Sequence, residues 1–135
     1  MKRALLGIMA MMMLAVSGCG DTSVAVVVPV ISPPSITSHV FTQDRVTELI
    51  SGSVAFQAPD SDIETMTVVA LDPRGLEKSR SVVLINLPGV IEGTIPFSID
   101  YRAFPTETFA YTFIIYLTDF NGNRSNQAVD TFFVP

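Results

Sequence analysis

The feature that most constrains the fold is the strict alternation of side chains along residues 109–118. The apolar face of this segment carries Phe109, Tyr111, Phe113, Ile115 and Leu117. A repeat of two residues is typical of a β-strand with one buried face. The run Asp119–Asn123 then favours a tight turn, because Asn and Gly tolerate positive φ. Residues 128–134 return as a second apolar strand, so the end of the chain is predicted to form a β-hairpin.

Five more extended segments precede this hairpin. They are predicted at residues 36–41, 53–57, 63–71, 79–85 and 94–101. Alternation within the third segment places Ile63 with Thr67 and Val69 on one face and Met66 on the other. No helix-length stretch shows the 3.6-residue period, and no internal repeat is visible. The sequence therefore predicts an all-β fold over residues 39–135, a length near the ~100 residues of an immunoglobulin-like sandwich.

Turn signals separate the predicted strands. Residues 58–62 combine a proline with clustered aspartates, and Asp72–Gly75 has proline at its second position and glycine at its fourth. Pro88 and Gly89 mark the next reversal. Pro96 cannot donate a ladder hydrogen bond, so the strand that contains it is predicted at the edge of a sheet.

A short basic segment and then an apolar one open the chain. Lys2 and Arg3 precede an uncharged run, residues 4–16, which is too short to span a bilayer as a helix. Small residues then lead to Cys19, the only cysteine. This is the layout of a secretory signal, so residues 1–18 are predicted to be a cleaved signal peptide.

The order Val16, Ser17, Gly18, Cys19 resembles the lipobox of bacterial lipoproteins. The resemblance implies that Cys19 becomes the new N-terminus and carries a diacylglycerol and an amide-linked chain such as palmitate, which together anchor firmly in a membrane. In that family, aspartate directly after the cysteine tends to mark inner-membrane retention. Here Gly20 follows Cys19, so the resemblance favours the outer membrane if the cell is Gram-negative. The alternative is an unmodified cysteine after a signal peptide.

Residues 19–38 are predicted to tether the body of the protein, the folded domain of residues 39–135, to the lipid on Cys19. Pro29, Pro33 and Pro34 favour extended, polyproline-like geometry. The segment Val24–Val28 does not fit a plain linker, because it is apolar, uncharged and rich in β-branched side chains. Two interpretations remain open: a disordered tether, or a strand that pairs with the sheet of the body or with a partner.

The charge of the chain changes once the signal peptide is removed. The balance moves from 8 basic and 13 acidic residues to 6 basic and 13 acidic, a net charge near −7. An acidic body argues against nucleic acid as a partner and against adhesion to anionic lipid headgroups. We therefore expect the lipid, rather than surface charge, to hold the protein at the membrane.

The C-terminal hairpin carries a second resemblance. The stretch from Tyr111 to Asp119, followed by residues 122–126 and a closing apolar strand, resembles the last hairpin of bacterial immunoglobulin-like and fibronectin type III-like modules. The resemblance implies a β-sandwich with a binding or spacing role and no reaction. Tyr111 matches the tyrosine-corner position. The chain has no tryptophan and no cysteine pair, so an antibody-type domain is not expected.

No catalytic constellation stands out in the sequence. A nucleophile with its base needs a histidine or an equivalent, and the only histidine, His39, lies near the start of the predicted domain. Nucleophile-elbow, phosphate-loop and multi-histidine patterns are missing. Asp60, Asp62 and Glu64 are close enough to serve as acid and base, but a solvated acidic turn is the favoured interpretation. We expect no enzyme, and the alternative is a small envelope hydrolase that uses this loop.

Calcium is the one cofactor that the sequence suggests, because calcium prefers several oxygen ligands and acidic loops can supply them. Two loops offer such oxygens, from Asp60, Asp62 and Glu64 in the first and Asp119, Asn121 and Asn123 in the second. The second loop echoes the start of an EF-hand. It departs from that pattern because Arg124 replaces the glycine at the sixth position and strand residues follow instead of a helix. A hairpin turn is therefore favoured, and no metal is expected.

The expected function is that of a lipid-anchored, non-catalytic binding or structural module. Its contact with another envelope protein or a surface glycan is expected through loops or a sheet edge. Tyr101, Arg102 and Phe104 are candidate contact residues on one loop, since binding residues often lie on loops held by a rigid scaffold. For Phe104, plugging the end of the core is the favoured role.

Overall fold

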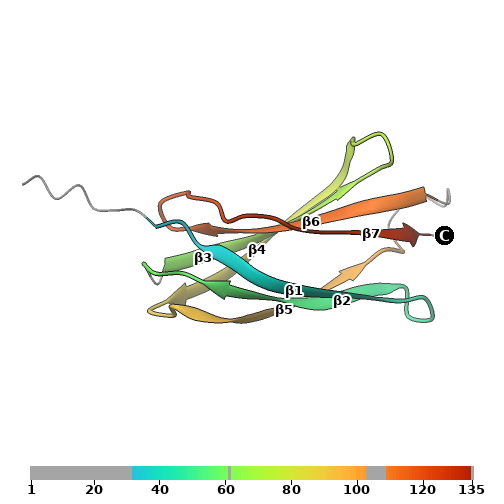
Figure 1. Ribbon diagram of the computed structural model, residues 1–135. Helices are drawn as coiled ribbons and strands as arrows, with labels where there is room; N and C mark the ends of the chain where they lie inside the picture. The colour runs from blue at the N-terminus through green and yellow to red at the C-terminus, as the bar shows by residue number, and fades with distance from the viewer. Residues whose placement is uncertain (1–31, 61, 103–108, 135) are drawn as a thin grey trace, which may run out of the picture. The chain divides into compact units, whose positions relative to one another are not determined.

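The computed structural model describes residues 32–60, 62–102 and 109–134. One antiparallel sheet has three strands, β1 (Ser35–Asp44), β2 (Leu49–Gln57) and β5 (Glu92–Asp100), in the order β1-β2-β5. The other antiparallel sheet has four strands, β3 (Asp62–Leu71), β4 (Glu77–Pro88), β6 (Phe109–Asp119) and β7 (Ala128–Val134), in the order β4-β3-β6-β7. Figure 1 shows the two sheets as layers. The described residues form an antiparallel β-sandwich, which confirms the predicted all-β fold class.

The core lies between the two sheets. On β6 the predicted alternation is confirmed for Tyr111, Phe113, Ile115 and Leu117, which are at most 1% exposed. The three-stranded sheet contributes its inward side chains from β2 and β5, namely Ile50, Val54, Phe56, Ile95 and Phe97. Full burial of one such side chain stabilises the fold by about 1.5–3 kcal/mol. These inward faces therefore supply most of the driving force for folding.

The predicted faces of β3 are wrong at its start, because the strand contains a β-bulge. Ile63 pairs with Asp119 and Thr65 with Thr118, so Glu64 is an extra residue relative to β6. The extra residue returns Ile63 to the same side as Met66, and both are buried in the core. The predicted alternation placed Ile63 and Met66 on opposite faces because it did not include the bulge. A bulge shifts the face of every residue beyond it.

Several strands extend beyond their predicted bounds. The first strand begins at Ser35, within the segment assigned to the tether, and β2 begins at Leu49 rather than at Ser53. Continuous pairing with a neighbour decides these limits: β2 keeps its register with β5 from Leu49 to Gln57. The strand β4 runs past the predicted Ser79–Ile85 at both ends, since it continues to pair with β3 around two register shifts.

The predicted turns are confirmed. In the β3–β4 hairpin, the amide of Gly75 donates to the carbonyl of Asp72 at 2.9 Å, and Gly75 has a φ of 79°. Gly89 follows β4 with the same φ. After β6, the amide of Gly122 donates to the carbonyl of Asp119 at 3.0 Å. Glycine adopts the left-handed conformation without steric cost, so these turns fix where the strands reverse.

One lateral side of the sandwich is closed where β1 approaches β7. The Nε2 group of Gln43 donates to the carbonyl of Phe133 at 2.7 Å, and the rings of Phe41 and Phe132 lie 6.1 Å apart. The side chain of Asn126 accepts a hydrogen bond from the amide of Ile36 at 2.6 Å and donates to its carbonyl at 2.9 Å. These contacts tie the first strand to the last hairpin. On the opposite lateral side of the sandwich, the edge strands are β4 and β5.

Candidate interaction site between the edge strands

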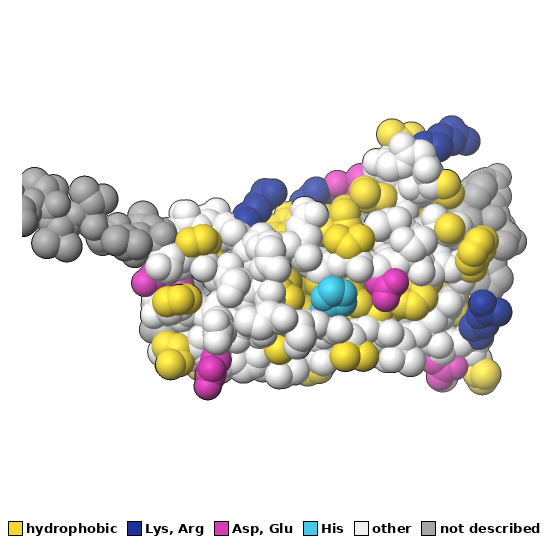
Figure 2. All heavy atoms as spheres, in the orientation of Figure 1, with side chains coloured by type: hydrophobic (Ala, Val, Ile, Leu, Met, Phe, Trp, Pro, Cys, Tyr) yellow, Lys and Arg dark blue, Asp and Glu magenta, His cyan; other side chains and the backbone are white. Residues whose placement is uncertain are grey.

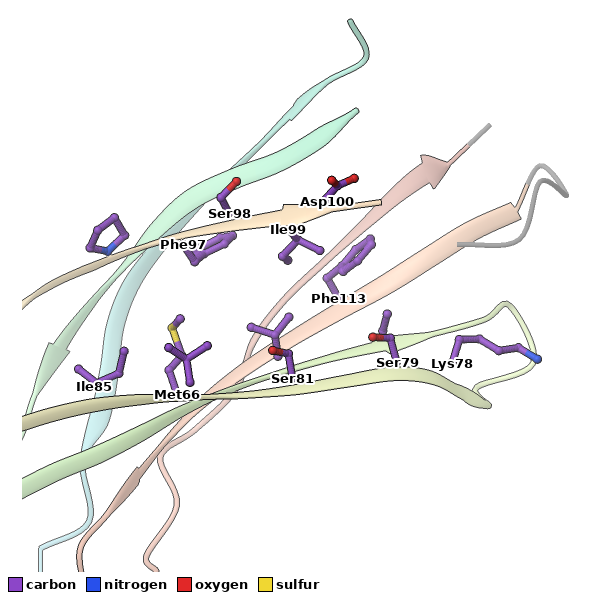
Figure 3. Close-up of a pocket in the computed structure, with 14 residues that line it drawn as sticks. Met66, Lys78, Ser79, Ser81, Ile85, Phe97, Ser98, Ile99, Asp100 and Phe113 are labelled. Carbon is purple, nitrogen blue, oxygen red and sulfur yellow. The ribbon is translucent and has the colours of Figure 1, made fainter. Parts of the chain in front are cut away.

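A pocket opens between β4 and β5, the edge strands of the two sheets. Its cavity volume is about 560 Å³, within the range of roughly 300–1,000 Å³ usual for binding pockets. It is lined by Met66, Val68, Ala70, Lys78, Ser79, Ser81, Val83, Ile85, Pro96, Phe97, Ser98, Ile99, Asp100 and Phe113. Figure 3 shows Phe97 and Ile99 directed from β5 toward Met66, Ser79 and Ser81 on the other sheet. We refer to this feature as the lateral pocket.

The lateral pocket forms because the two edge strands are not bridged along their length by any described strand. The inward side of β4 presents Ser79, Ser81, Val83 and Ile85. Toward the hairpin these side chains are small, and the floor beneath them includes Ala70. Small side chains on one wall and on the floor leave space between the sheets that an apolar guest can fill. The pocket can therefore receive side chains from outside the domain.

The charged groups at the mouth of the pocket already have partners. The Lys78 ammonium lies 3.4 Å from a carboxylate oxygen of Asp72. Arg102 donates to both carboxylate oxygens of Asp100, and these side-chain hydrogen bonds lower the pKa of Asp100 to about 2. Asp72 is held in place by amide hydrogen bonds from Leu76 and Arg74, and the bond from Leu76 is the main cause of its lowered pKa. The remaining lining is uncharged, so it suits an uncharged guest.

The edge of β4 beside the pocket carries exposed apolar side chains. Val82 is 60% exposed, Val83 is 42% exposed and Leu84 is 70% exposed. Val83 lines the pocket, whereas Val82 and Leu84 lie on the outer face of the sheet. Consecutive exposed apolar residues on an edge strand are uncommon in soluble proteins, which usually protect such edges. This edge is therefore the strongest candidate interaction surface among the described residues.

Two β-bulges limit the regular part of that edge. Ala70 and Leu71 pair with Ser79 and Glu77, so Lys78 is an extra residue. A second shift follows Leu84, close to Asn86, whose φ is 50°. Between the two bulges, residues 79–84 keep an unbroken register with β3. The backbone groups of this run that face away from β3 are arranged to accept another strand.

The outer face of the four-stranded sheet holds a cluster around Tyr116. The guanidinium of Arg80 donates to the hydroxyl of Tyr116 at 2.9 Å and makes a two-point contact with Glu77. The guanidinium of Arg124 lies 4.8 Å from the centre of the same ring. Figure 2 shows Lys and Arg side chains along the side that carries this sheet and the β3–β4 hairpin. The cluster fixes Arg80 beside the apolar part of β4.

The two predicted acidic loops lie together at the end of the sandwich where β3 begins. The side chain of Asn121 donates to Asp62 at 3.3 Å, and Asp60 accepts from the amide of Ser32 at 3.0 Å. Burial raises the pKa of Asp62, with smaller contributions from the charges of Asp119 and Asp60. The other Asp62 oxygen is buried and has no hydrogen-bond partner in the structure. The sequence suggested both loops, but only the fold brings them side by side.

Asp119 acts as the internal brace of the β6–β7 turn. One of its carboxylate oxygens accepts from the amides of Asn121 at 2.9 Å and Asn123 at 2.8 Å, and the other accepts from the Asn123 side chain at 2.8 Å. Glu64 occupies the bulge of β3 and is half-buried. Among the described residues, no group of three or more acidic, histidine or cysteine side chains could hold a metal ion. The geometry of this end therefore supports turn formation.

The other residues singled out in the sequence are dispersed. His39 is exposed on β1, where its ring meets Phe41 edge to face at 5.5 Å. Tyr101 is only 3% exposed, and its hydroxyl donates to the carbonyl of Asp44 at 3.3 Å, so the expectation that it is a loop contact residue is wrong. Arg102 pairs with Asp100. Phe104, Cys19 and Val24–Val28 lie outside the described residues.

Sequence reasoning missed the lateral pocket. The only signal for it was the run from Val82 to Ile85, which is apolar on both faces. Such a run is typical of a strand buried on both sides, yet β4 lies at an edge. An edge strand with the composition of a central strand marks a surface that another element can cover.

The chain was compared with known proteins. It matches no protein-family model and no curated protein. Within residues 32–60, 62–102 and 109–134, no helix is long and apolar enough to cross a membrane. We therefore infer function from the side chains and the sheet edges themselves.

Proposed function

We propose that this protein is a lipid-anchored cell-envelope protein that acts as a non-catalytic binding module. Its body engages an extended polypeptide segment along the free edge of β4, and the side chains of that segment enter the lateral pocket. The observation that carries the proposal is the unpaired, exposed and apolar run Val82–Leu84 beside a pocket of about 560 Å³.

The chemistry of the edge selects a polypeptide partner. Strand addition supplies affinity through main-chain hydrogen bonds, and pockets for alternate side chains supply specificity. β4 offers both features, because its run from residue 79 to 84 is regular and its inward side chains Ser81 and Val83 line the pocket. A glycan needs converging polar groups, whereas the uncharged lining here is mainly apolar with serine hydroxyls. A protein strand is the better match to this surface.

The pocket also defines the side chains that the partner inserts. Lys78 and Asp100 are paired with Asp72 and Arg102, so no lining charge awaits a counterion. A buried charge without a partner is strongly destabilising. The inserted side chains are therefore apolar or carry hydroxyl groups.

The membrane anchor in this proposal rests on the sequence. The order Val16, Ser17, Gly18, Cys19 resembles a lipobox, and Cys19 is the only thiol available for lipidation. Metabolic labelling with an alkyne analogue of palmitate tests it: the wild-type protein is expected to take up the label and a Cys19→Ser variant to lose it. Equal labelling of both proteins would remove the anchor from the proposal.

The hydrolase alternative gains no support from the acidic loops. The carboxylate of Asp119 is engaged by two amides and one side chain of its own turn. Asp60 accepts from the backbone of Ser32, and Asp62 from Asn121. These contacts favour a structural role for the loops, so the proposal contains no catalytic step.

Site-directed photo-crosslinking in intact cells tests the binding site. A photoreactive amino acid at Val83 is expected to trap a protein adduct, because this side chain faces the pocket. The matched control is Val46, which is 93% exposed but lies in the β1–β2 turn. The proposal predicts adducts at residue 83 that are absent at residue 46. Equal adducts at both positions, or none at either, would contradict it.

A further inference from the structure

We infer that the strand that β4 accepts is β4 of a second copy of this chain. This inference rests on the proposed function of the β4 edge and names its partner. The two strands pair antiparallel about a two-fold axis, so that the four-stranded sheets of both copies form one continuous sheet.

The side-chain pattern of β4 is compatible with self-pairing. A two-fold axis perpendicular to the sheet keeps the outer faces of both copies on the same side, and residues directly opposite each other then share a face. Arg80, Val82 and Leu84 are on the outer face, and Ser81 and Val83 are on the inner face. Self-pairing therefore places outer residues opposite outer residues without a conflict.

The bulges select the register. An axis through Val82 pairs residues 80–84 of both copies, and all of them lie within the regular run between the bulges. Val82 then faces its own symmetry mate, and Leu84 faces the partner's Arg80. An axis through Ser81 would instead place Leu84 opposite the partner's Lys78, which is a bulged residue outside the regular ladder. An axis at Val83 would pair Val82 with Leu84 but would place Ser81 opposite the second bulge. The axis at Val82 therefore pairs five residues of each copy within the regular run and includes both Val82 and Leu84.

Charge also favours this edge for self-association. The body is acidic, so two copies repel each other over most of their surfaces. Around the start of β4, by contrast, Lys78 and Arg80 are paired with Asp72 and Glu77, so this edge carries little net charge. In the chosen register no charged residue of 80–84 faces a like charge. The hydrogen bond to Tyr116 on β6 directs the guanidinium of Arg80 away from the free edge, so it leaves the space beside the partner's Leu84 open.

The other sheet edges are poorer sites for strand addition. β1 and β7 lie against each other, tied by the Gln43–Phe133 hydrogen bond. The strand β5 contains Pro96, which has no amide to donate. Among the described strands, β4 is therefore the edge best suited to pair with a copy of itself.

The predicted dimer is reversible. Pairing through one short strand from each copy makes a small interface, and small interfaces are typical of weak, transient association. Covalent trapping is the appropriate test. In the full chain, Val82→Cys is expected to give a crosslinked dimer on mild oxidation or with a short bis-maleimide, because the two cysteines meet at the axis. Val129→Cys is the matched control, since Val129 is 45% exposed on β7 of the same sheet.

A charge-exchange experiment tests the axis itself. Val82→Lys or Val82→Glu places two like charges opposite each other, so each variant alone is expected to lose the dimer at least about tenfold by analytical ultracentrifugation. Mixing the two variants is expected to restore it, because a lysine then faces a glutamate. Val82 is 60% exposed, so both variants should fold, and circular dichroism checks this.

The outcomes separate this inference from the proposed function. Equal trapping at residues 82 and 129, or a mixture that does not recover the dimer, would overturn self-pairing. If in addition a photoreactive residue 83 captures a different protein, the binding site stands and only the identity of its partner is wrong. If residue 83 captures nothing, the proposed function fails as well. Selective trapping at residue 82 together with recovery in the mixture would establish the two-fold pair.

Discussion

Replacing Asp119 by alanine should destabilise the domain strongly, although Asp119 takes part in no proposed binding. The buried carboxylate accepts three hydrogen bonds of 2.8–2.9 Å from Asn121 and Asn123. A hydrogen bond to a charged group contributes about 1.5–3 kcal/mol, and such contributions are not additive within one turn. Because the half-buried side chain of Asn123 can turn partly to water, we expect the free energy of unfolding to fall by about 3 kcal/mol. For a domain of this size that corresponds to roughly 10–20 °C in Tm.

Urea unfolding and differential scanning calorimetry measure this loss. The matched control is Asp130→Ala, since Asp130 is exposed on β7 and accepts one hydrogen bond from the neighbouring amide of Thr131. The control should change the free energy of unfolding by less than about 0.5 kcal/mol. A loss of less than 1 kcal/mol for Asp119→Ala would refute the idea that this carboxylate braces the turn. If the Tm of the wild type fell on addition of a calcium chelator, the loop would hold a metal, contrary to the turn interpretation.

Three further substitutions test other parts of the fold. Asp62→Asn should stabilise the domain by at most about 1 kcal/mol at neutral pH, because it removes the charge of a half-buried carboxylate, one of whose oxygens is buried without a hydrogen-bond partner. Burial raises the pKa of Asp62, so the wild type loses stability as pH rises from the unfolded value through the folded value; titrating both proteins from pH 3 to 7 should show the gain mainly at the upper end. Gly52→Ala should cost about 3 kcal/mol or more in chemical denaturation, because the new Cβ would lie 1.8 Å from the carbonyl oxygen of Val40. Asn126→Ala should lower the free energy of unfolding by about 2 kcal/mol and speed hydrogen exchange at Ile36, because the amide and the carbonyl of Ile36 both lose a hydrogen-bond partner. Unchanged exchange would argue against the idea that Asn126 ties β1 to the last hairpin.

The fold class and the turns could be predicted because each rests on local chemistry. Gly75, Gly89 and Gly122 have positive φ at the predicted reversals, and Pro96 lies on an edge strand as expected from its missing amide. The inner face of β6 followed directly from its two-residue period. These signals depend only on neighbours in the chain, so one sequence is enough to identify them.

The candidate site could not be predicted, because it depends on which strands become neighbours. The run Val82–Ile85 has the composition of a central strand, and only the strand order shows that it lies at an edge. The bulge at Glu64 reverses the face of Ile63, and a single extra residue leaves no clear mark in the sequence. Likewise, Asp62 and Asn121 meet only after β3 and β6 have paired.

The bulges at the two ends of the regular run in β4 also determine where association stops. An unbroken edge could recruit one chain after another, as happens in fibrils, where each added strand presents a fresh template. Here Lys78 and the left-handed Asn86 interrupt the ladder on both sides of a short run. A two-fold pair uses that run on both copies, so each completed pair offers no further equivalent edge for growth. In the proposed pair, these irregularities keep the docking run of β4 short, and two-fold closure protects the chain against unlimited polymerisation.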